Sequence, residues 1–266
     1  MLYRKVAVAR VYSIALNTFR ELYRGKVLYA VVFFAVLLVV AASAFGAVTV
    51  GDQLLVIKDI GLFSISFFSM GFAVIAGATL LHKELSRKTI YNILAKPVER
   101  YEFLLGKYLG MLAVSLFMVV LMALALTGYI FLFSRVWEWG IMAALIYTFM
   151  ELSIICACAI FFSTIVVTPV LGGLFTLGIF LAGRSLEYLM YFIQEGELAG
   201  LSAGLMRALY FTLPNFSSLN ISGEIVFGDF SALGADRVLW SLLYSISYAA
   251  VLLLLANFAF RRREFN

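Results

Sequence analysis

The feature that most restricts this sequence is a set of long apolar stretches without a charged residue. The clearest, residues 27–48, holds 22 consecutive residues free of Asp, Glu, Lys and Arg. As an α-helix it is about 33 Å long, enough to cross the ~30 Å hydrocarbon core of a membrane. Hydrophobic residues make up 64% of the 266-residue chain and charged residues 13%, whereas a soluble domain is roughly half apolar and about a quarter charged. The sequence therefore predicts an all-α integral membrane protein.

Six stretches of this kind predict six transmembrane helices in a single domain, residues 1–266. Trp137 and Trp139 stand just after the third stretch, a typical place for interfacial aromatic residues. The pair Thr168-Pro169 separates the fourth stretch from the fifth and indicates a tight turn. The expected spans are 27–48, 60–81, 109–133, 141–162, 166–183 and 238–260.

The N-terminal segment, residues 1–26, is basic and amphipathic. A helix of this kind lies in the membrane interface with its cations towards anionic headgroups. A cytosolic helix packed on a neighbour is the alternative. A cleaved signal peptide is disfavoured, because a 26-residue leader is too long for the charged part of such a peptide. The expected apolar face holds Val8, Tyr12, Ala15, Leu16, Phe19 and Tyr23, and the polar face holds Arg10, Ser13, Asn17, Arg20 and Arg24.

The distribution of cations predicts the orientation of the chain. With both termini and residues 82–107 on one side, that side holds 15 of the 20 Lys and Arg residues. Cytoplasmic loops carry such an excess, so both termini and this segment are expected in the cytoplasm. Lys58 and Asp59 then lie in a short external loop before the second span. Residues 184–236 form a long external connection with apolar, helix-like parts.

Residues 82–107 form a polar segment between the second and third spans. From Lys83 to Glu102 this segment holds five cations and three carboxylates. Apolar residues such as Ile90 and Ile93 give it a partial helical stripe. Pro97 ends that helix and suits the start of another. The pattern predicts a rigid surface feature that docks on a soluble partner, and a solvated loop without a partner is the alternative.

The sequence offers little chemistry of its own. Its one histidine, His82, excludes a histidine cluster, and Cys156 and Cys158 point to different helix faces at i,i+2, so we expect neither a metal site nor a disulfide. No G-x-x-x-x-G-K phosphate-binding loop is present. The lack of a recognisable nucleophile and base makes a membrane enzyme the least favoured class.

Glu151 lies near the middle of the fourth span. A charged, unpaired carboxylate in lipid costs several kcal/mol, about 2.5–3.5 on insertion scales, so Glu151 is expected to face protein or a cavity, or to be protonated. A place in a translocation path or dimer interface, and a neutral acid bonded to a nearby Ser or Thr, are both open. Arg184 and Glu187, at i,i+3, predict a local ion pair.

The polar segment resembles the cytoplasmic segment of ABC-2-type ABC transporter permeases. The similarity extends to the N-terminal helix, to a motif before the last span and to the C-terminal end. It is closest to the permease group associated with multicopper-enzyme maturation, which includes a copper-processing system. The residues that carry it are Lys83-Glu84-Leu85, Arg87-Lys88-Thr89-Ile90-Tyr91, Ile93-Leu94-Ala95-Lys96-Pro97-Val98, Leu105-Gly106-Lys107-Tyr108, Ala15 to Leu22, Leu213-Pro214-Asn215-Phe216 and Phe260 to Phe265.

The resemblance implies a permease subunit, itself not an enzyme, in a bacterial or archaeal cytoplasmic membrane. It implies two permease copies, or one copy and a paralogue, driven by two ATPase subunits that bind the ATP. It also implies an interfacial N-terminal helix, a coupling helix between spans two and three, and external helices between spans five and six. No cofactor and no nucleic-acid partner are expected, and membrane lipids are the other neighbours. The residues expected to dock on the ATPase are Glu84, Arg87, Lys88, Ile90, Ile93, Leu94, Pro97 and Arg100.

The function that these features favour is that of an ATP-driven exporter. A proton-coupled secondary carrier that uses Glu151 is one alternative, and it would work without an ATPase. A membrane scaffold that transports nothing is another, and it would not stimulate an ATPase.

Overall fold

The structure, a computed structural model, describes residues 2–48, 53–86, 99–135, 137–188, 191, 201–228 and 234–262. Within these residues the elements are α-helices and one 3-10 helix, and none of them is a strand. They are α1 (Leu2–Tyr23), α2 (Lys26–Val48), α3 (Gln53–Ser86), α5 (Arg100–Ser134), α6 (Trp139–Ile165), α7 (Pro169–Arg184), α9 (Leu201–Thr212), η1 (Ser217–Leu219), α10 (Ser222–Val226) and α11 (Ala235–Arg262).

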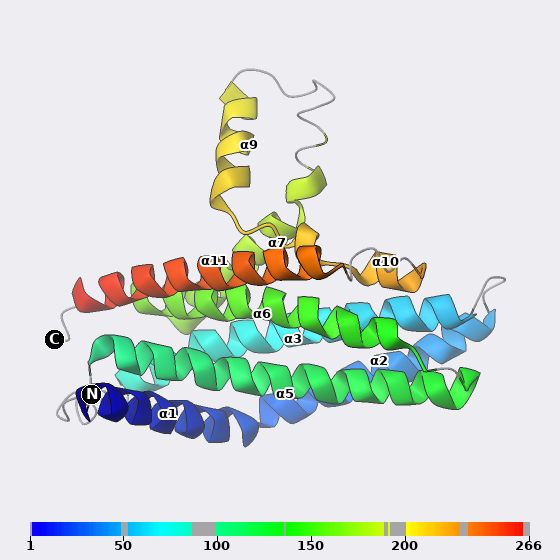
Figure 1. Ribbon diagram of the computed structural model, residues 1–266, viewed down its shortest axis with the longest axis horizontal. Helices are drawn as coiled ribbons and strands as arrows, with labels where there is room; N and C mark the ends of the chain where they lie inside the picture. The colour runs from blue at the N-terminus through cyan, green and yellow to red at the C-terminus, as the bar shows by residue number, and fades with distance from the viewer. Residues whose placement is uncertain are drawn as a thin grey trace.

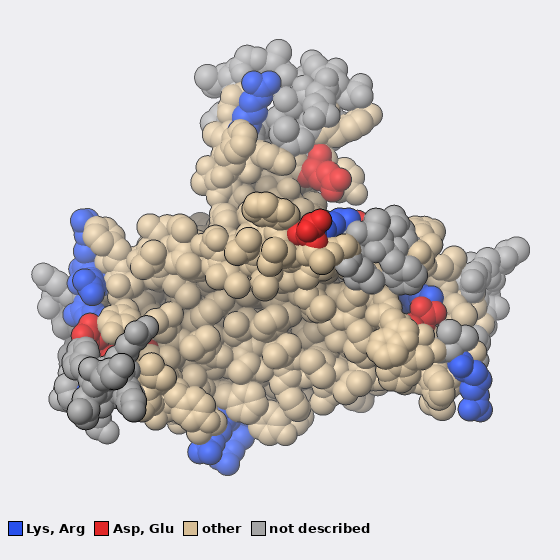
Figure 2. Space-filling model, viewed as in Figure 1, with Lys and Arg blue, Asp and Glu red and all other residues tan. Residues whose placement is uncertain are grey.

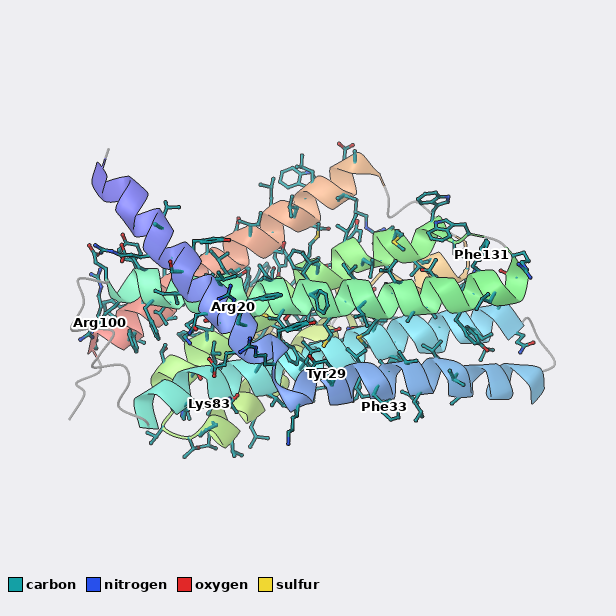
Figure 3. The ribbon with its side chains drawn as sticks, turned by 90° about the horizontal axis from the view of Figure 1, so that it is seen from below. Arg20, Tyr29, Phe33, Lys83, Arg100 and Phe131 are labelled. Atoms are coloured by element: carbon teal, nitrogen blue, oxygen red, sulfur yellow. The ribbon has the colours of Figure 1, made fainter. Side chains whose placement is uncertain are left out.

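The long helices α2, α3, α5, α6 and α11 run along one common direction and form a bundle (Figure 1). Both chain termini lie at the same end of this bundle, which we call the terminal end. Lys83 and Arg100 lie at the terminal end and Phe131 at the opposite end, while α1 crosses the start of α5 obliquely (Figure 3). Helix α9 projects sideways from the bundle (Figure 1).

Among the described residues, four helices are long and apolar enough to cross a membrane: α3, α5, α6 and α11. Within the described residues, Val31–Ala41 of α2 and the whole of α7 are shorter apolar helices. Figure 2 shows a broad uncharged band across the long helices, with the charged side chains of this face at its margins. The all-helical, apolar architecture is therefore confirmed, and the count of six spans stays a prediction.

The helices extend beyond the stretches that hydropathy marks. Helix α3 begins at Gln53, so Lys58 and Asp59 lie inside it rather than in the expected loop. Lys58 Nζ pairs with Glu138 Oε1 at 2.7 Å, which accommodates a cation in the second turn of the helix. Helix α5 begins at Arg100, where the Glu99 backbone N–H donates to Glu102 Oε2 at 3.2 Å. Apolar composition locates the lipid-facing part of a helix, whereas such caps locate its ends.

Helix α6 lies at the centre of the bundle, with buried residues around its whole circumference. It packs against α3, α5, α7 and α11. Small buried residues such as Ala157 and Ala159 allow this crowding. Near its end, Ser163 Oγ donates to the Gly77 carbonyl of α3 at 3.0 Å. A helix that is apolar on every side belongs in the interior, as α6 does.

Helix α1 packs closely on the first turns of α5. Gly106 and Gly110 stand at i and i+4 on α5, a spacing of small residues that permits close helix approach. A Cβ at Gly110 would lie 2.6 Å from the Ala15 carbonyl oxygen of α1, and one at Gly106 would lie 2.7 Å from Ile14 Cβ. The expected alternative, a helix packed on a neighbour, is therefore realised over this face.

The remaining surface of α1 keeps an amphipathic pattern. Val8 and Tyr12 are 64% and 67% exposed and share one flank of the helix. Arg20 and Arg24 are exposed on the next flank. An apolar flank beside a cationic one suits the membrane interface, so an interfacial position for α1 stays a prediction that is compatible with its packing on α5.

Replacing Gly110 by Ala is expected to weaken the attachment of α1. The backbone of Ala15 cannot rotate away, so α1 must shift, and overpacking of this kind costs about 1–3 kcal/mol. Gly128→Ala on the same helix is the control, because a Cβ there meets nothing within 4 Å, and it gains up to about 1 kcal/mol of helix propensity. Thermal unfolding in detergent should rank Gly110→Ala below wild type and Gly128→Ala at or above it. Equal stability of the two variants would contradict this packing.

Candidate functional site

A buried ion pair joins three helices in the interior of the bundle. Arg184 Nη1, at the end of α7, donates to Glu151 Oε1 of α6 at 2.7 Å and to Ser66 Oγ of α3 at 3.2 Å. Ser66 Oγ in turn donates to Glu151 Oε2 at 3.3 Å. Glu151 is 3% exposed, and the Arg184 side chain is 27% exposed. Both carboxylate oxygens therefore have a donor.

The chain returns to cap the end of α7 beside this ion pair. The Phe216 backbone N–H donates to the Gly183 carbonyl at 3.2 Å, and Ser217 Oγ donates to the Arg184 carbonyl at 2.7 Å. Only glycine fits at position 183, because any Cβ there would overlap the Pro214 carbonyl oxygen. The Phe180 ring stands between the Phe216 ring, 5.7 Å away, and the Arg184 guanidinium, 5.6 Å away. The helix end is thus satisfied by the chain itself.

This site combines a helix end with a buried ion pair, and both features are typical of functional regions in membrane proteins. Irregular backbone is tolerated at such depth only where protein or a cavity surrounds it. Intramembrane ionisable residues commonly mark substrate or ion pathways. We refer to Glu151, Arg184, Ser66 and Ser217 as the polar centre. It is the first candidate site, and it can hold α3, α6 and α7 in one fixed arrangement.

A second set of charges lies at the terminal end. Lys107 of α5 is 2% exposed, and its Nζ lies 3.9 Å from Glu21 Oε2 of α1. Lys83 of α3 lies 3.7 Å from the other oxygen of Glu21. Arg10 of α1 lies 3.6 Å from Glu102 of α5. These pairs connect α1 to the α3 end and to the α5 end of the polar segment.

Arg100 links the start of α5 to the end of α11. Its Nη1 donates to the Phe260 carbonyl at 2.7 Å and to the Arg261 carbonyl at 3.0 Å. Its guanidinium carbon lies 5.7 Å from the centroid of the Phe260 ring. The Phe260 ring stacks with Phe103 of α5 at 6.2 Å. The terminal end therefore joins α1, α3, α5 and α11.

The sequence matches a known protein family over more than half of its length. Residues 19–183, more than half of the chain, match the family described as ABC-2 family transporter protein. The chain belongs to the ABC-2 transporter family. It is accordingly a multi-pass membrane protein and the permease component of an ABC transporter, a family in which an ATPase is the partner. No curated protein matches the sequence.

The resemblance read from the sequence is thus confirmed for the ABC-2 permease family. The match begins inside α1 and ends one residue before Arg184, so it includes Glu151 and the polar segment. The narrower group associated with multicopper-enzyme maturation stays a prediction.

The residues predicted to dock on the ATPase fall in different parts of this ABC-2 permease. Glu84 belongs to the last turn of α3, and Arg100 is the first residue of α5. The other predicted docking residues lie outside the described part of the chain: Arg87, Lys88, Ile90, Ile93, Leu94 and Pro97.

The polar centre was only partly predicted. Glu151 has a serine partner, Ser66, as one of the two alternatives predicted. It also binds Arg184, which the sequence had predicted to pair with Glu187. Arg184 pairs with Glu151 rather than with Glu187, because the end of α7 lies beside α6 and the Arg184 guanidinium reaches the Glu151 carboxylate at 2.7 Å. One signal was available: Glu151 is a lone acid in the fourth apolar stretch, and Arg184 is a lone cation directly after the fifth.

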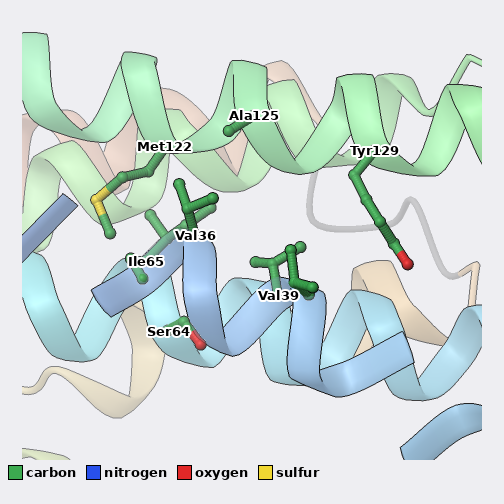
Figure 4. Close-up of a pocket in the computed structure, with 9 residues that line it drawn as sticks. Val36, Val39, Ser64, Ile65, Met122, Ala125 and Tyr129 are labelled. Carbon is green, nitrogen blue, oxygen red and sulfur yellow. The ribbon is translucent and has the colours of Figure 1, made fainter. Parts of the chain in front are cut away.

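Apolar cavities also lie between the described helices of the ABC-2 permease. One of about 60 Å³ lies between α2, α3 and α5, with Val36, Ser64 and Tyr129 among its lining residues (Figure 4). Another of about 330 Å³ lies between α5, α6 and α11. Among the described residues no group of three or more His, Cys, Asp or Glu side chains is arranged to hold a metal ion. Neither cavity includes the polar centre.

Removing one member of the buried ion pair is expected to destabilise the protein strongly. Arg184→Leu leaves the Glu151 charge buried without its cation, and such changes cost about 3–5 kcal/mol. The double variant Glu151→Leu/Arg184→Leu removes both charges and should recover most of that loss. A double-mutant cycle from unfolding in detergent should therefore give a coupling energy above about 1 kcal/mol.

The matched control is the exposed pair Arg237–Glu224, which is bidentate at 2.9 and 2.8 Å. Its side chains are 41% and 31% exposed, so its coupling energy should stay within about 1 kcal/mol. Additive effects at positions 151 and 184 would show that the buried pair does not stabilise the fold.

Proposed function

We propose that this permease is the membrane subunit of an ATP-driven exporter, and that it works as a dimer with two ATPase subunits docked on residues 82–107. The observation that carries this proposal is the continuity of α3 and α5. Helix α3 ends at Ser86 and α5 begins at Arg100, so each runs as one unbroken helix of 34 or 35 residues from the polar segment into the bundle. A push on the segment reaches both helices directly.

In the proposed mechanism, α3 and α5 transmit movement of the polar segment into the membrane. Closure of the ATPase pair on ATP brings the two docked segments together. Because α3 and α5 are rigid, the movement becomes a tilt of whole helices, a discrete change rather than a diffuse one. The close packing of α1 at Gly106 and Gly110 keeps it attached to α5 as the helices move, and Glu21 links it to Lys83 and Lys107. The two permeases are identical copies or a copy and a paralogue.

The docking surface follows the pattern of other protein interfaces. Ile90, Ile93 and Leu94 form its apolar anchor in a groove of the ATPase, where buried apolar residues carry most of the binding energy. The surrounding charges set register and specificity. Those charges are Glu84, Arg87 and Lys88, and Pro97 fixes the corner of the segment. Arg100, which the sequence grouped with them, instead directs its guanidinium to the Phe260 and Arg261 carbonyls of α11 and is left out of the docking surface.

In this proposal the terminal end faces the cytoplasm of a bacterium or archaeon, and α9 and α10 face outward. The excess of cations at the terminal end supports that orientation. ATP binds only to the partner chain.

A second candidate function rests on the polar centre. Glu151 is an intramembrane carboxyl with a serine and an arginine in reach, and such residues serve proton relays in secondary carriers. A proton-coupled carrier would transport in liposomes without an ATPase. A membrane scaffold would neither transport nor raise ATP hydrolysis by a reconstituted partner.

Ile93→Asp is expected to abolish co-purification of the partner ATPase with this permease. The change places a charge at the centre of an apolar interface, where truncations of anchor residues cost about 2 kcal/mol or more. Phe211→Asp is the control, because Phe211 is 84% exposed on α9 and lies away from the terminal end. Both variants should reach the membrane in wild-type amounts. Full retention of the ATPase by Ile93→Asp would refute docking on this segment.

The proposed orientation is open to a direct test by labelling of cysteines in cells. Cys156 and Cys158 are buried, so introduced cysteines should dominate the reaction with a membrane-impermeant maleimide. Lys96→Cys should react only after the cells are opened. Arg207→Cys, on α9, should react in intact cells. Labelling of Lys96→Cys from outside would overturn the orientation and the ATPase docking with it.

A further inference from the structure

The end of α11 is held by a residue that belongs to α5. The last carbonyl groups of a helix have no partners within it, and they form the negative end of its dipole. Arg100 supplies a cation to two of them, the carbonyls of Phe260 and Arg261, at 2.7 and 3.0 Å. Charge-assisted hydrogen bonds of this kind are roughly twice as strong as neutral ones. They join positions that are 160 residues apart in the chain.

Ring packing reinforces this junction. Phe260 is fully buried, and its ring is nearly parallel to that of Phe103, with an interplanar angle of 15°. The Arg100 guanidinium lies 5.7 Å from the Phe260 centroid, a distance at which a cation and a ring attract each other. Arg100, Phe103 and Phe260 thus form one unit, which we call the α5–α11 junction.

Away from the junction, α5 and α11 are held apart. The cavity of about 330 Å³ lies between them over α6, with Tyr108 and Leu112 of α5 on one wall and Ala249 and Leu253 of α11 on another. Helix α11 packs more extensively on α6 than on α5. The junction is therefore a direct connection through which movement of the start of α5 reaches α11.

We propose that Arg100 is a positioning residue that couples α11 to the polar segment, so that α11 follows α5 when the ATPase closes. The proposal rests on the proposed function, because it needs the segment 82–107 to be driven. It adds that the driven unit includes the last span as well as the two helices that flank the segment. Arg100 belongs to the polar segment, is the first residue of α5, and donates to the carbonyls of α11.

The test uses the full complex of permease and ATPase in nanodiscs, with backbone hydrogen exchange measured by mass spectrometry. Exchange at the far ends of α3 and α11 is compared between the nucleotide-free state and the state trapped with ATP and vanadate. In wild type, both helix ends should change. In Arg100→Ala, the change at α3 should persist and the change at α11 should be lost, while the nucleotide-free exchange of the far end of α11 stays as in wild type.

Two further variants keep the test decisive. Arg100→Lys keeps the charge but not the planar group that bonds two carbonyls and covers a ring, so the α11 response should fall between the other two. Arg262→Ala is the control, because Arg262 lies over the exposed ring of Phe258, 4.2 Å from its centroid, at the same helix end. Its α11 response should equal that of wild type.

The outcomes separate the two proposals. An intact α11 response in Arg100→Ala would overturn the role of Arg100 and leave the ATPase-driven mechanism standing. A wild-type complex in which neither helix responds to trapping would overturn the proposed function itself. Raised exchange along α11 without nucleotide in Arg100→Ala would reduce Arg100 to a purely structural contact.

Discussion

The end of α7 inside an apolar bundle imposes the strictest condition on this structure. Backbone carbonyls at a helix end need donors, and lipid offers none. The returning chain provides them through the Phe216 N–H and the Ser217 hydroxyl. The same helix end carries Arg184, whose charge in turn requires Glu151. The same helix end therefore constrains both the path of the chain after α7 and the presence of an acid in α6.

The two charged regions hold their helices by different means. At the terminal end, the contacts of Glu21 with Lys83 and Lys107 are 3.7 and 3.9 Å long, and the Glu21 and Lys83 side chains are substantially exposed. Water weakens such pairs, so the attachment of α1 depends mainly on its close packing at Gly106 and Gly110. At the polar centre the pair is short and buried, and the loss of one partner is costly. Steric fit holds α1, whereas electrostatics holds α7.

The sequence predicted the elements better than their connections. Uncharged stretches indicated helices over most of the chain, because a helix is the form in which a single segment satisfies its own backbone in lipid. The pairing of Arg184 with Glu151 and of Arg100 with α11 was not predicted, because each joins residues that lie far apart in the sequence. The spacing of Gly106 and Gly110 signals a close helix approach, but it does not name the helix that approaches.

The positions of the apolar cavities and of the polar centre together indicate which helix can move. Protein interiors are close-packed, so rigid elements move only where packing is incomplete. Helix α5 lines both apolar cavities, the one of about 60 Å³ beside α2 and α3 and the one of about 330 Å³ beside α6 and α11. The polar centre ties α3, α6 and α7 to one another and leaves α5 out. In the proposed mechanism α5 is thus the helix with room to tilt, and it is also the helix to which α1 and the end of α11 are fastened.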